Sequence, residues 1–279
     1  MTGFARIASL PAWSVLMLTA FLAACGGGGG GDGGAAAPSP GTPVPTAPGA
    51  GCGVACQGRG PQPIDLQTAE QFSILAETAI TNIPTSAVTG NVGLGPASGV
   101  NIELTCAEVT GGVIYTMDSA GSPSCRQRNS ANLLNQAVAD GHTAWHDGRL
   151  RPTDYTDVAG GDIGGLSLPP ATYKWNTDLR IPANLTLSGG PNDVWIFVIE
   201  HDLIVGSGVQ VLLEGGALPQ NVFWLTIALD ADVDLGAGSQ FKGVILSETS
   251  IAMRAGATIH GRLMAATSIN LEQNTVTPP

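Results

Sequence analysis

The 279-residue sequence carries a net charge of −11 and contains only 11 lysines and arginines. So few cations cannot form the basic surface that follows nucleic-acid phosphates, which argues against a nucleic-acid partner. Charged residues make up 12% of the chain and aromatic residues 5%, whereas glycine contributes 39 residues. This composition argues against a helical bundle and against an enzyme core rich in titratable groups, and it favours a β-rich, repetitive body.

The chain begins with an apolar segment that is typical of an export signal. Arg6 precedes an apolar run that Pro11 interrupts, whereas a membrane span needs about 20 apolar residues. The run ends in Leu22-Ala23-Ala24-Cys25, which resembles the lipobox of bacterial lipoproteins. The resemblance implies that residues 1–24 are removed and that Cys25 carries lipid, so that the domain is anchored outside the cell, at the outer membrane or cell surface. An ordinary cleaved signal with a chance cysteine is the alternative.

Residues 25–63 have the composition of a tether. They are rich in Gly, Pro, Ala and Thr and contain almost no large apolar side chain before Ile64. Such a segment cannot bury enough apolar surface to offset the entropy lost on ordering. We therefore expect a disordered tether over residues 25–63 and one folded domain over residues 64–279.

Four cysteines remain once Cys25 is assigned to lipidation. Cys52 and Cys56 lie in the tether and Cys106 and Cys125 lie further on, so pairing within each couple is the simplest of three connectivities. A Cys106–Cys125 bond would close a loop of about 20 residues and contribute roughly 3 kcal/mol. Zinc binding is the alternative, but no histidine is close in sequence, and the oxidising environment of an exported chain favours disulfides.

One helix is expected between residues 129 and 148. Apolar residues recur there at spacings of four, three and four, which places Leu134, Val138, Gly141 and Trp145 on a single stripe. The stripe predicts that the helix packs along one side of the domain. Residues 101–128, which precede it, are expected to form a loop or cap insertion.

The second half of the chain repeats with an 18-residue period. Apolar strands followed by small-residue corners recur, and the corners end at Gly190, Gly208, Gly238, Gly256 and Asn274. Three of the four intervals between these corners equal one period, and we interpret the longer interval, from Gly208 to Gly238, as one period with a 12-residue excursion. A fixed period with Gly or Asn at the corner is typical of a β-solenoid, here with about three short strands per coil.

Alternation along each strand predicts which side chains fill the solenoid. The expected inward residues are Ile251, Met253, Ile259, Ile269, Leu271 and Val276. The expected outward residues are Ala252, Arg254, Asn270 and Glu272.

Several ordered blocks resemble those of the DUF3494 ice-binding family. Together they extend over nearly all of residues 64–277, and they include Phe72-Ser73-Ile74-Leu75-Ala76, Val88-Thr89-Gly90-Asn91-Val92-Gly93, Asp193-Val194-Trp195-Ile196-Phe197, Asn221-Val222-Phe223-Trp224 and Gly261-Arg262-Leu263. The resemblance implies a discontinuous right-handed β-helix, with one long helix alongside and the N-terminal strands next to the C-terminal coils. It also implies binding of ice through a flat face, without catalysis or cofactor; we expect a monomer.

Ice binding requires a flat, stiff surface whose outward groups are short and can hold ordered water. Outward positions that stack at the 18-residue interval pair Thr249 with Thr267, Ser250 with Ser268 and Ala252 with Asn270, and Thr81 and Thr89 join them if the N-terminal strands insert there. The alternative is that Thr and Ser simply suit exposed strands. Charged residues also interrupt the array, because Asp234 occupies the position equivalent to Ala252 and Arg254 and Glu272 lie nearby.

A carbohydrate-active enzyme is a second class of function for a β-helix. Asp230, Asp232 and Asp234 alternate, as a calcium site or a carboxylate pair would require, and Asp154, Asp157 and Asp162 form a looser acidic group. A solvated face that discourages edge pairing explains such carboxylates equally well.

Histidines give no clear metal motif. His142 and His146 stand four apart on the expected helix, but Thr143 occupies the position where a zinc protease carries glutamate, so we expect no metal site. A surface adhesin or structural module without affinity for ice is the third class of function.

Overall fold

The computed structural model describes residues 58–120 and 126–279. The predicted signal, Cys25 and residues 26–57 of the predicted tether lie outside the described residues, as do Cys52, Cys56 and Cys125. The described part is mostly β, with short parallel strands and one α-helix, α1 (Ala131–Arg149). No helix in this part of the chain is long and apolar enough to span a membrane.

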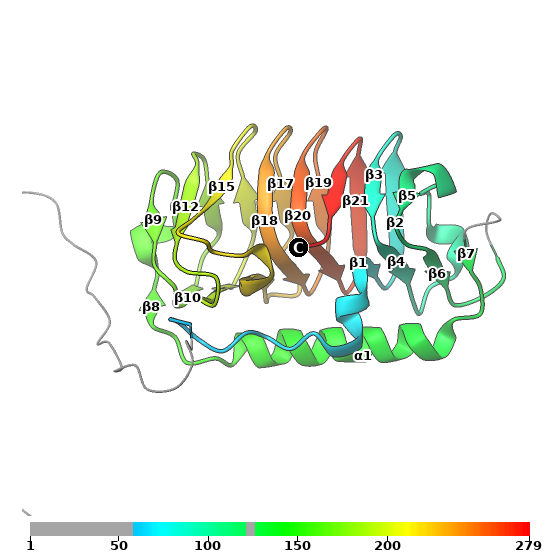
Figure 1. Ribbon diagram of the computed structural model, residues 1–279, viewed down its shortest axis with the longest axis horizontal. Coiled ribbons are helices and arrows are strands. Elements are labelled where there is room, and N and C mark those ends of the chain that lie inside the picture. The colour runs from blue at the N-terminus through cyan, green and yellow to red at the C-terminus, as the bar shows by residue number, and fades with distance from the viewer. Residues whose placement is uncertain (1–57, 121–125) are drawn as a thin grey trace, which may run out of the picture. The chain divides into compact units, whose positions relative to one another are not determined.

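Parallel strands stack in coils whose sides form three faces (Figure 1). Face a is the outer side of a ten-strand run in the order β7 (Arg126–Gln127), β6 (Ile114–Thr116), β4 (Asn91–Leu94), β1 (Phe72–Ala76), β20 (Thr258–Ala265), β18 (Gln240–Ser247), β16 (Val222–Thr226), β13 (Trp195–Ile199), β10 (Thr172–Trp175) and β8 (Tyr155–Thr156). Face b is the outer side of a six-stranded sheet in the order β11 (Leu179–Ile181), β14 (Leu203–Val205), β17 (Val233–Leu235), β19 (Ile251–Met253), β21 (Ser268–Glu272) and β2 (Ala79–Ile83). Face c carries β9 (Ser167–Leu168), β12 (Leu185–Ser188) and β15 (Val211–Glu214), then the first halves of β18 and β20, then β22 (Thr275–Thr277), β3 (Ala87–Thr89) and β5 (Val109–Thr110).

Strands β18 and β20 turn from face c to face a without a break. Gly243 and Gly261 are paired at the middle of the two strands, and Gly243 has a φ of +116°. A Cβ atom on Gly261 would lie 1.7 Å from the carbonyl oxygen of Gly243. The backbones of β18 and β20 can therefore stay in contact around this corner only because both residues lack a side chain.

The N-terminal coil is inserted next to the C-terminal coil, as the family resemblance implies. β1 pairs with β20, β2 with β21 and β3 with β22, all in parallel. In Figure 1 the cyan N-terminal strands accordingly stand beside the red C-terminal ones. The last coil is thus enclosed within the β-helix and does not lie at its end.

The predicted 18-residue period is confirmed for the last coils. Val233 pairs with Ile251 and Ile251 with Ile269, and the predicted excursion lies between β14 and its partner β17. The equivalence of Gly190 and Gly208 is wrong, because Gly190 follows β12 on face c whereas Gly208 follows β14 on face b. On its other side β14 pairs with β11, which precedes it by more than one period. Small residues end strands at several different corners, so their presence alone does not identify equivalent positions.

The interior of the coils holds the main hydrophobic core. All six predicted inward residues are buried, and the predicted outward ones are not. Stacked aromatic rings form a ladder on the inner side of the sheet that carries face a. In this ladder the ring centroids of Phe197 and Trp224 lie 4.0 Å apart and those of Tyr173 and Phe197 lie 5.3 Å apart. Such contacts fix the register of successive coils as well as burying area.

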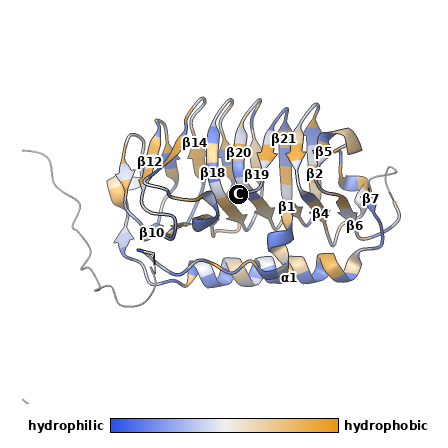
Figure 2. Ribbon diagram, in the orientation of Figure 1, coloured by the Kyte–Doolittle hydropathy of each residue, from blue (hydrophilic) through white to orange (hydrophobic). Residues whose placement is uncertain are grey.

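Helix α1 covers face a and closes a second core. Its buried residues are Leu134, Ala137, Asp140, Ala144 and Gly148, and the helix carries both hydrophobic and hydrophilic bands in Figure 2. Of the predicted stripe, Leu134 is buried, whereas Val138, Gly141 and Trp145 lie half-buried at the margin of the contact. The contact is centred on small residues because the helix lies close to the sheet: a Cβ atom on Gly148 would come within 2.5 Å of Leu225 Cδ2.

The end of the predicted tether packs against the domain. The amide of Val194 donates a 3.0 Å hydrogen bond to the carbonyl of Arg59, and the Arg59 side chain forms an ion pair with Asp193. Further along, the short helix η1 (Gln67–Gln71) lies against α1, where the amide of Thr68 donates to Asp140. The folded unit therefore begins before the predicted boundary at Ile64.

The stretch predicted as a loop or cap insertion carries regular structure. Two short helices, η2 (Gly99–Asn101) and η3 (Cys106–Glu108), are followed by β5, β6 and β7, and Ile102 forms a bridge with Ile80 of β2. These elements add a further coil at one end of the β-helix. The Cys106–Cys125 and Cys52–Cys56 pairings stay predictions.

Candidate functional site

Face b brings together the residues that the sequence predicts to contact ice. Ala252, Asn270 and Thr81 are neighbours in one outward row across β19, β21 and β2. Ser250 and Ser268 occupy the preceding outward position, and the amide of Thr267 donates a 3.0 Å hydrogen bond to the carbonyl of Thr249 at the adjoining corner. Thr89 does not join them, because β3 lies on face c.

The hydroxyls of face b are largely engaged with other protein groups. Thr81 Oγ1 donates to Asn270 Oδ1 over 2.8 Å, and Ser250 Oγ donates to Asp232 Oδ1 over 2.7 Å. Thr249 Oγ1 donates to the carbonyl of Ala231 and lies 3.0 Å from Asp232 Oδ1. These bonds fix the direction of each hydroxyl, and each oxygen keeps lone pairs with which to accept hydrogen bonds from water.

Two of the charged side chains on face b, Asp234 and Arg254, form an ion pair. Arg254 donates two hydrogen bonds to the Asp234 carboxylate, from Nε to Oδ1 over 2.9 Å and from Nη2 to Oδ2 over 2.7 Å. A two-bond guanidinium–carboxylate contact holds both side chains in one geometry. Face b therefore carries this fixed pair and a row of short polar and apolar side chains, with Glu272 of β21 and Arg180 of β11 as further charged residues.

Most of the acidic residues that could indicate an enzyme accept local hydrogen bonds or pair with a cation. Asp230 lies in a turn outside β17, Asp232 accepts bonds from Ser250 and Thr249, and Asp234 is paired with Arg254. At the β8 end of the molecule, Asp154 accepts from the amide of Thr172 and Asp157 from that of Asn176. Within residues 58–120 and 126–279, no three His, Cys, Asp or Glu side chains gather as a metal site would require.

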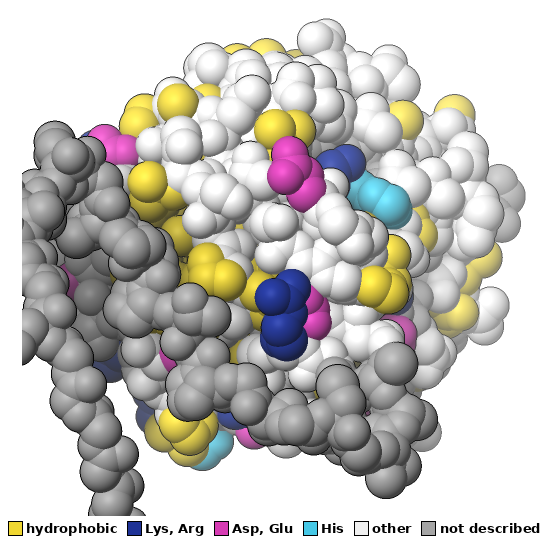
Figure 3. Space-filling model, turned by 60° about the vertical axis from the view of Figure 1, so that its left-hand side comes forward, with side chains coloured by type: hydrophobic (Ala, Val, Ile, Leu, Met, Phe, Trp, Pro, Cys, Tyr) yellow, Lys and Arg dark blue, Asp and Glu magenta, His cyan; other side chains and the backbone are white. Residues whose placement is uncertain are grey.

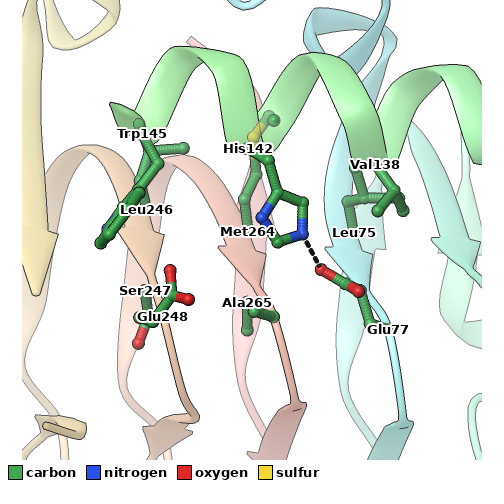
Figure 4. Close-up of a pocket in the computed structure, with 12 residues that line it drawn as sticks. Leu75, Glu77, Val138, His142, Trp145, Leu246, Ser247, Glu248, Met264 and Ala265 are labelled. Carbon is green, nitrogen blue, oxygen red and sulfur yellow. Dashed lines mark hydrogen bonds and ion pairs between the residues drawn. The ribbon is translucent and has the colours of Figure 1, made fainter. Parts of the chain in front are cut away.

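A small pocket lies between α1 and face a (Figure 4). Gly141 opens it, because this position leaves space where a side chain would stand. His142 Nε2 and Glu77 Oε1 lie 2.5 Å apart at its rim, with Glu248 nearby. Burial raises the pKa of Glu77, although the contact with His142 lowers it. This contact joins α1 to the residue that follows β1, so it fastens the helix to the sheet.

Few charged side chains lie on the side of the molecule shown in Figure 3, where Lys, Arg, Asp, Glu and His are scattered among uncharged groups.

Three parallel sheets, an enclosed last coil and a helix along one face define a discontinuous β-helix. The predicted contact residues lie on the outer side of one of these sheets, face b, and at its edge.

The chain belongs to the Ice-binding-like family, whose model matches residues 74–277. An ice-binding protein of Colwellia sp. is 42% identical over 221 residues, which cover 79% of this chain and 85% of the relative. One of Flavobacterium frigoris (strain PS1) is 44% identical over 218 residues, with 77% and 76% covered. The solved DUF3494 domain of Shewanella frigidimarina ice-binding protein_1 superposes with a TM-score of 0.69 at 26% identity, over 78% of this chain and 98% of that one.

Proposed function

We propose that this protein binds ice crystals through face b and is not an enzyme. Membership of the Ice-binding-like family over residues 74–277 is the observation that carries the proposal. The geometry supports it, because Thr81, Asn270 and Ala252 present short side chains in register on paired parallel strands. The seven predicted contacts are Thr81, Thr249, Ser250, Ala252, Thr267, Ser268 and Asn270.

Rigidity is the physical basis of the proposed contact. Ice presents water molecules at fixed positions. A protein surface that matches them pays the smallest entropic cost on binding when its own side chains are already immobile. The bonds from Thr81 to Asn270 and from Ser250 to Asp232 remove rotamer freedom before contact occurs. Short side chains also allow the sheet to approach the crystal closely.

Thermal hysteresis and inhibition of ice recrystallisation test the proposal directly. We expect the purified chain to be active in both assays and Thr267→Tyr to lower thermal hysteresis severalfold, because Thr267 is exposed at the edge of face b. Thr143→Tyr, on the exposed side of α1, is the matched control and should retain full activity. A folded chain inactive in both assays would contradict ice binding and favour the adhesin.

We also propose that the chain is exported and lipid-anchored through Cys25, with the domain outside the cell. The support is the lipobox-like Leu22-Ala23-Ala24-Cys25, which follows an apolar run. Labelling of the expressing cells with a radioactive fatty acid should mark the wild-type chain and leave Cys25→Ala unlabelled. Equal labelling of both chains would overturn this assignment.

A further inference from the structure

A second set of short side chains lies on face c, where the N-terminal and C-terminal coils meet. One outward row runs through Thr258, Thr275 and Ala87, and the next runs through Thr277, Thr89 and Thr110. We call these six residues the threonine patch. Five of the six are threonine, although the strands that carry them come from opposite ends of the domain sequence.

The hydroxyls of the threonine patch are free to bond outward. Thr89, Thr110, Thr275 and Thr277 are exposed, and none of their hydroxyls bonds to another group in the described part of the chain. Only Thr258 Oγ1 makes an internal contact, at 3.4 Å from the carbonyl of Ser239. On face b, by contrast, the hydroxyls of Thr81, Thr249 and Ser250 are all donated to protein acceptors.

Buried hydrogen bonds hold these strands rigid from within. Ser86 Oγ donates to Asn82 Oδ1 over 2.8 Å, and Asn82 Nδ2 donates to Glu108 over 2.8 Å. Asn274 Nδ2 donates to the carbonyls of Arg254 and Ala257, and its amide donates to Ser86 Oγ. The network joins successive coils at the corner where the chain enters β3, β5 and β22, the strands that carry most of the patch. Threonine is itself restricted at χ1, so its hydroxyl and methyl groups keep defined directions.

The patch carries no charge and ends at two basic residues. Lys242 and His260 continue the second row beyond Thr277. Burial lowers the pKa of His260 and Lys242 lowers it further, which favours the uncharged form of the imidazole. Protein interfaces rely on aromatic and arginine anchors at their centre, and the patch has neither.

We propose that the threonine patch is a second ice-contact surface, next to face b around the corner formed by residues 84–86. Strand geometry spaces its side chains at about 4.8 Å between coils and about 6.7 Å along a strand, which makes a two-dimensional grid of hydroxyl and methyl groups. A crystal of water molecules is the partner that such an uncharged, regular and rigid grid fits. This inference rests on the proposed function, since it requires that the chain binds ice.

Fluorescently labelled protein adsorbed to a single-crystal ice hemisphere tests the inference, because the pattern shows which crystal planes are bound. We expect Thr89→Tyr to lose part of the wild-type pattern and to lower thermal hysteresis, and Thr267→Tyr to retain the part that Thr89→Tyr loses. The double variant should lose adsorption altogether. Ser167→Tyr, exposed on β9 of face c, is the matched control and should keep the wild-type pattern.

Thr110→Tyr, on the strand that ends the second row, repeats the test if Thr89→Tyr does not fold. A folded Thr89→Tyr or Thr110→Tyr chain with the wild-type pattern and hysteresis would overturn the second surface and leave the proposed function standing. A wild-type chain that does not adsorb at all would instead overturn the proposed function, and the second surface with it.

Discussion

Gly261 and Gly141 should respond in opposite ways to the same substitution. Gly261→Ala places a methyl group against the backbone of Gly243, so we expect a loss of about 1–3 kcal/mol in the free energy of unfolding. Gly141→Ala fills open space in a helix and should add about 0.5–1 kcal/mol. Denaturant titration of both variants measures the two effects. A Gly261→Ala chain as stable as wild type would show that the corner is not closely packed.

Asp193 and Arg59 form one ion pair but should differ in what their removal costs. The Arg59 side chain is 69% exposed and that of Asp193 is 7% exposed. Arg59→Ala should therefore cost less than about 1 kcal/mol. Asp193→Ala also removes the acceptor for the amides of Arg59 and Gly190, and we expect a loss of about 1–3 kcal/mol. Equal losses, measured by thermal or denaturant unfolding, would contradict this account.

Individual contacts were only partly predictable from the sequence. Strand alternation predicts that Thr81 and Asn270 point outward, and the structure makes them neighbours. It does not predict that their side chains bond to each other, nor that Thr89 lies on face c, because both depend on how the turn at residues 84–86 directs the chain. The threonine patch was missed for the same reason: its two halves are distant in sequence and become neighbours only when the coils close.

Among the elements, α1 depends on small residues where it meets the sheet. Ala144 is buried in the core between α1 and face a, whereas Ala139 is exposed on the opposite side of the helix. Ala144→Leu should push the helix away and cost about 1–3 kcal/mol, while Ala139→Leu should be nearly neutral. Unfolding measurements on both variants check the prediction. Similar stability for the two would mean that the helix adjusts its position freely.

A hydrophobic stripe predicted this helix but not its orientation. Leu134, Val138 and Trp145 are large enough to be noticed in a periodicity, whereas the centre of the contact is made by Ala137, Ala144 and Gly148. Alanine and glycine contribute little to a hydrophobic pattern, yet they allow the closest approach between a helix and a sheet. Asp140, buried among them, bonds to the amide of Thr68, which no local pattern reveals.

At the scale of the whole molecule, three buried carboxylates should make stability depend on pH. Burial alone would raise the pKa of Glu108, Asp140 and Asp193, but the hydrogen bonds that each accepts outweigh it and lower the pKa. Their stabilisation is present above the ordinary pKa values of 4.5 and 3.8 and is lost as pH falls through the lower folded values. Glu77, whose pKa is raised, contributes an opposing slope.

We expect the free energy of unfolding to fall as pH is lowered below about 4.5, and Asp193→Asn to lose less over that range than wild type. Denaturant unfolding at a series of pH values measures both. An identical pH dependence for wild type and Asp193→Asn would show that Asp193 does not contribute to acid sensitivity.

The stacking of coils could be predicted from the sequence pattern, whereas the place of the N-terminal strands among them could not. A constant 18-residue interval indicates stacked coils because each coil must place the same side chains over the last, and the final coils obey it. The earlier coils depart from it, since their corners vary in length and hide the register. The insertion of β1, β2 and β3 beside the C-terminal coil follows from the family resemblance and not from any local pattern.

Because the last coil is enclosed, both ends of the β-helix lie in the middle of the chain. One end is the coil of β6 and β7 and the other is the coil of β8, and α1 is the segment that joins them (Figure 1). Each additional coil would increase the distance between these two ends by about 4.8 Å. A helix spans that distance with about three more residues. The length of α1 and the number of coils are therefore coupled, so a lineage that gains a coil must also gain nearly one helical turn.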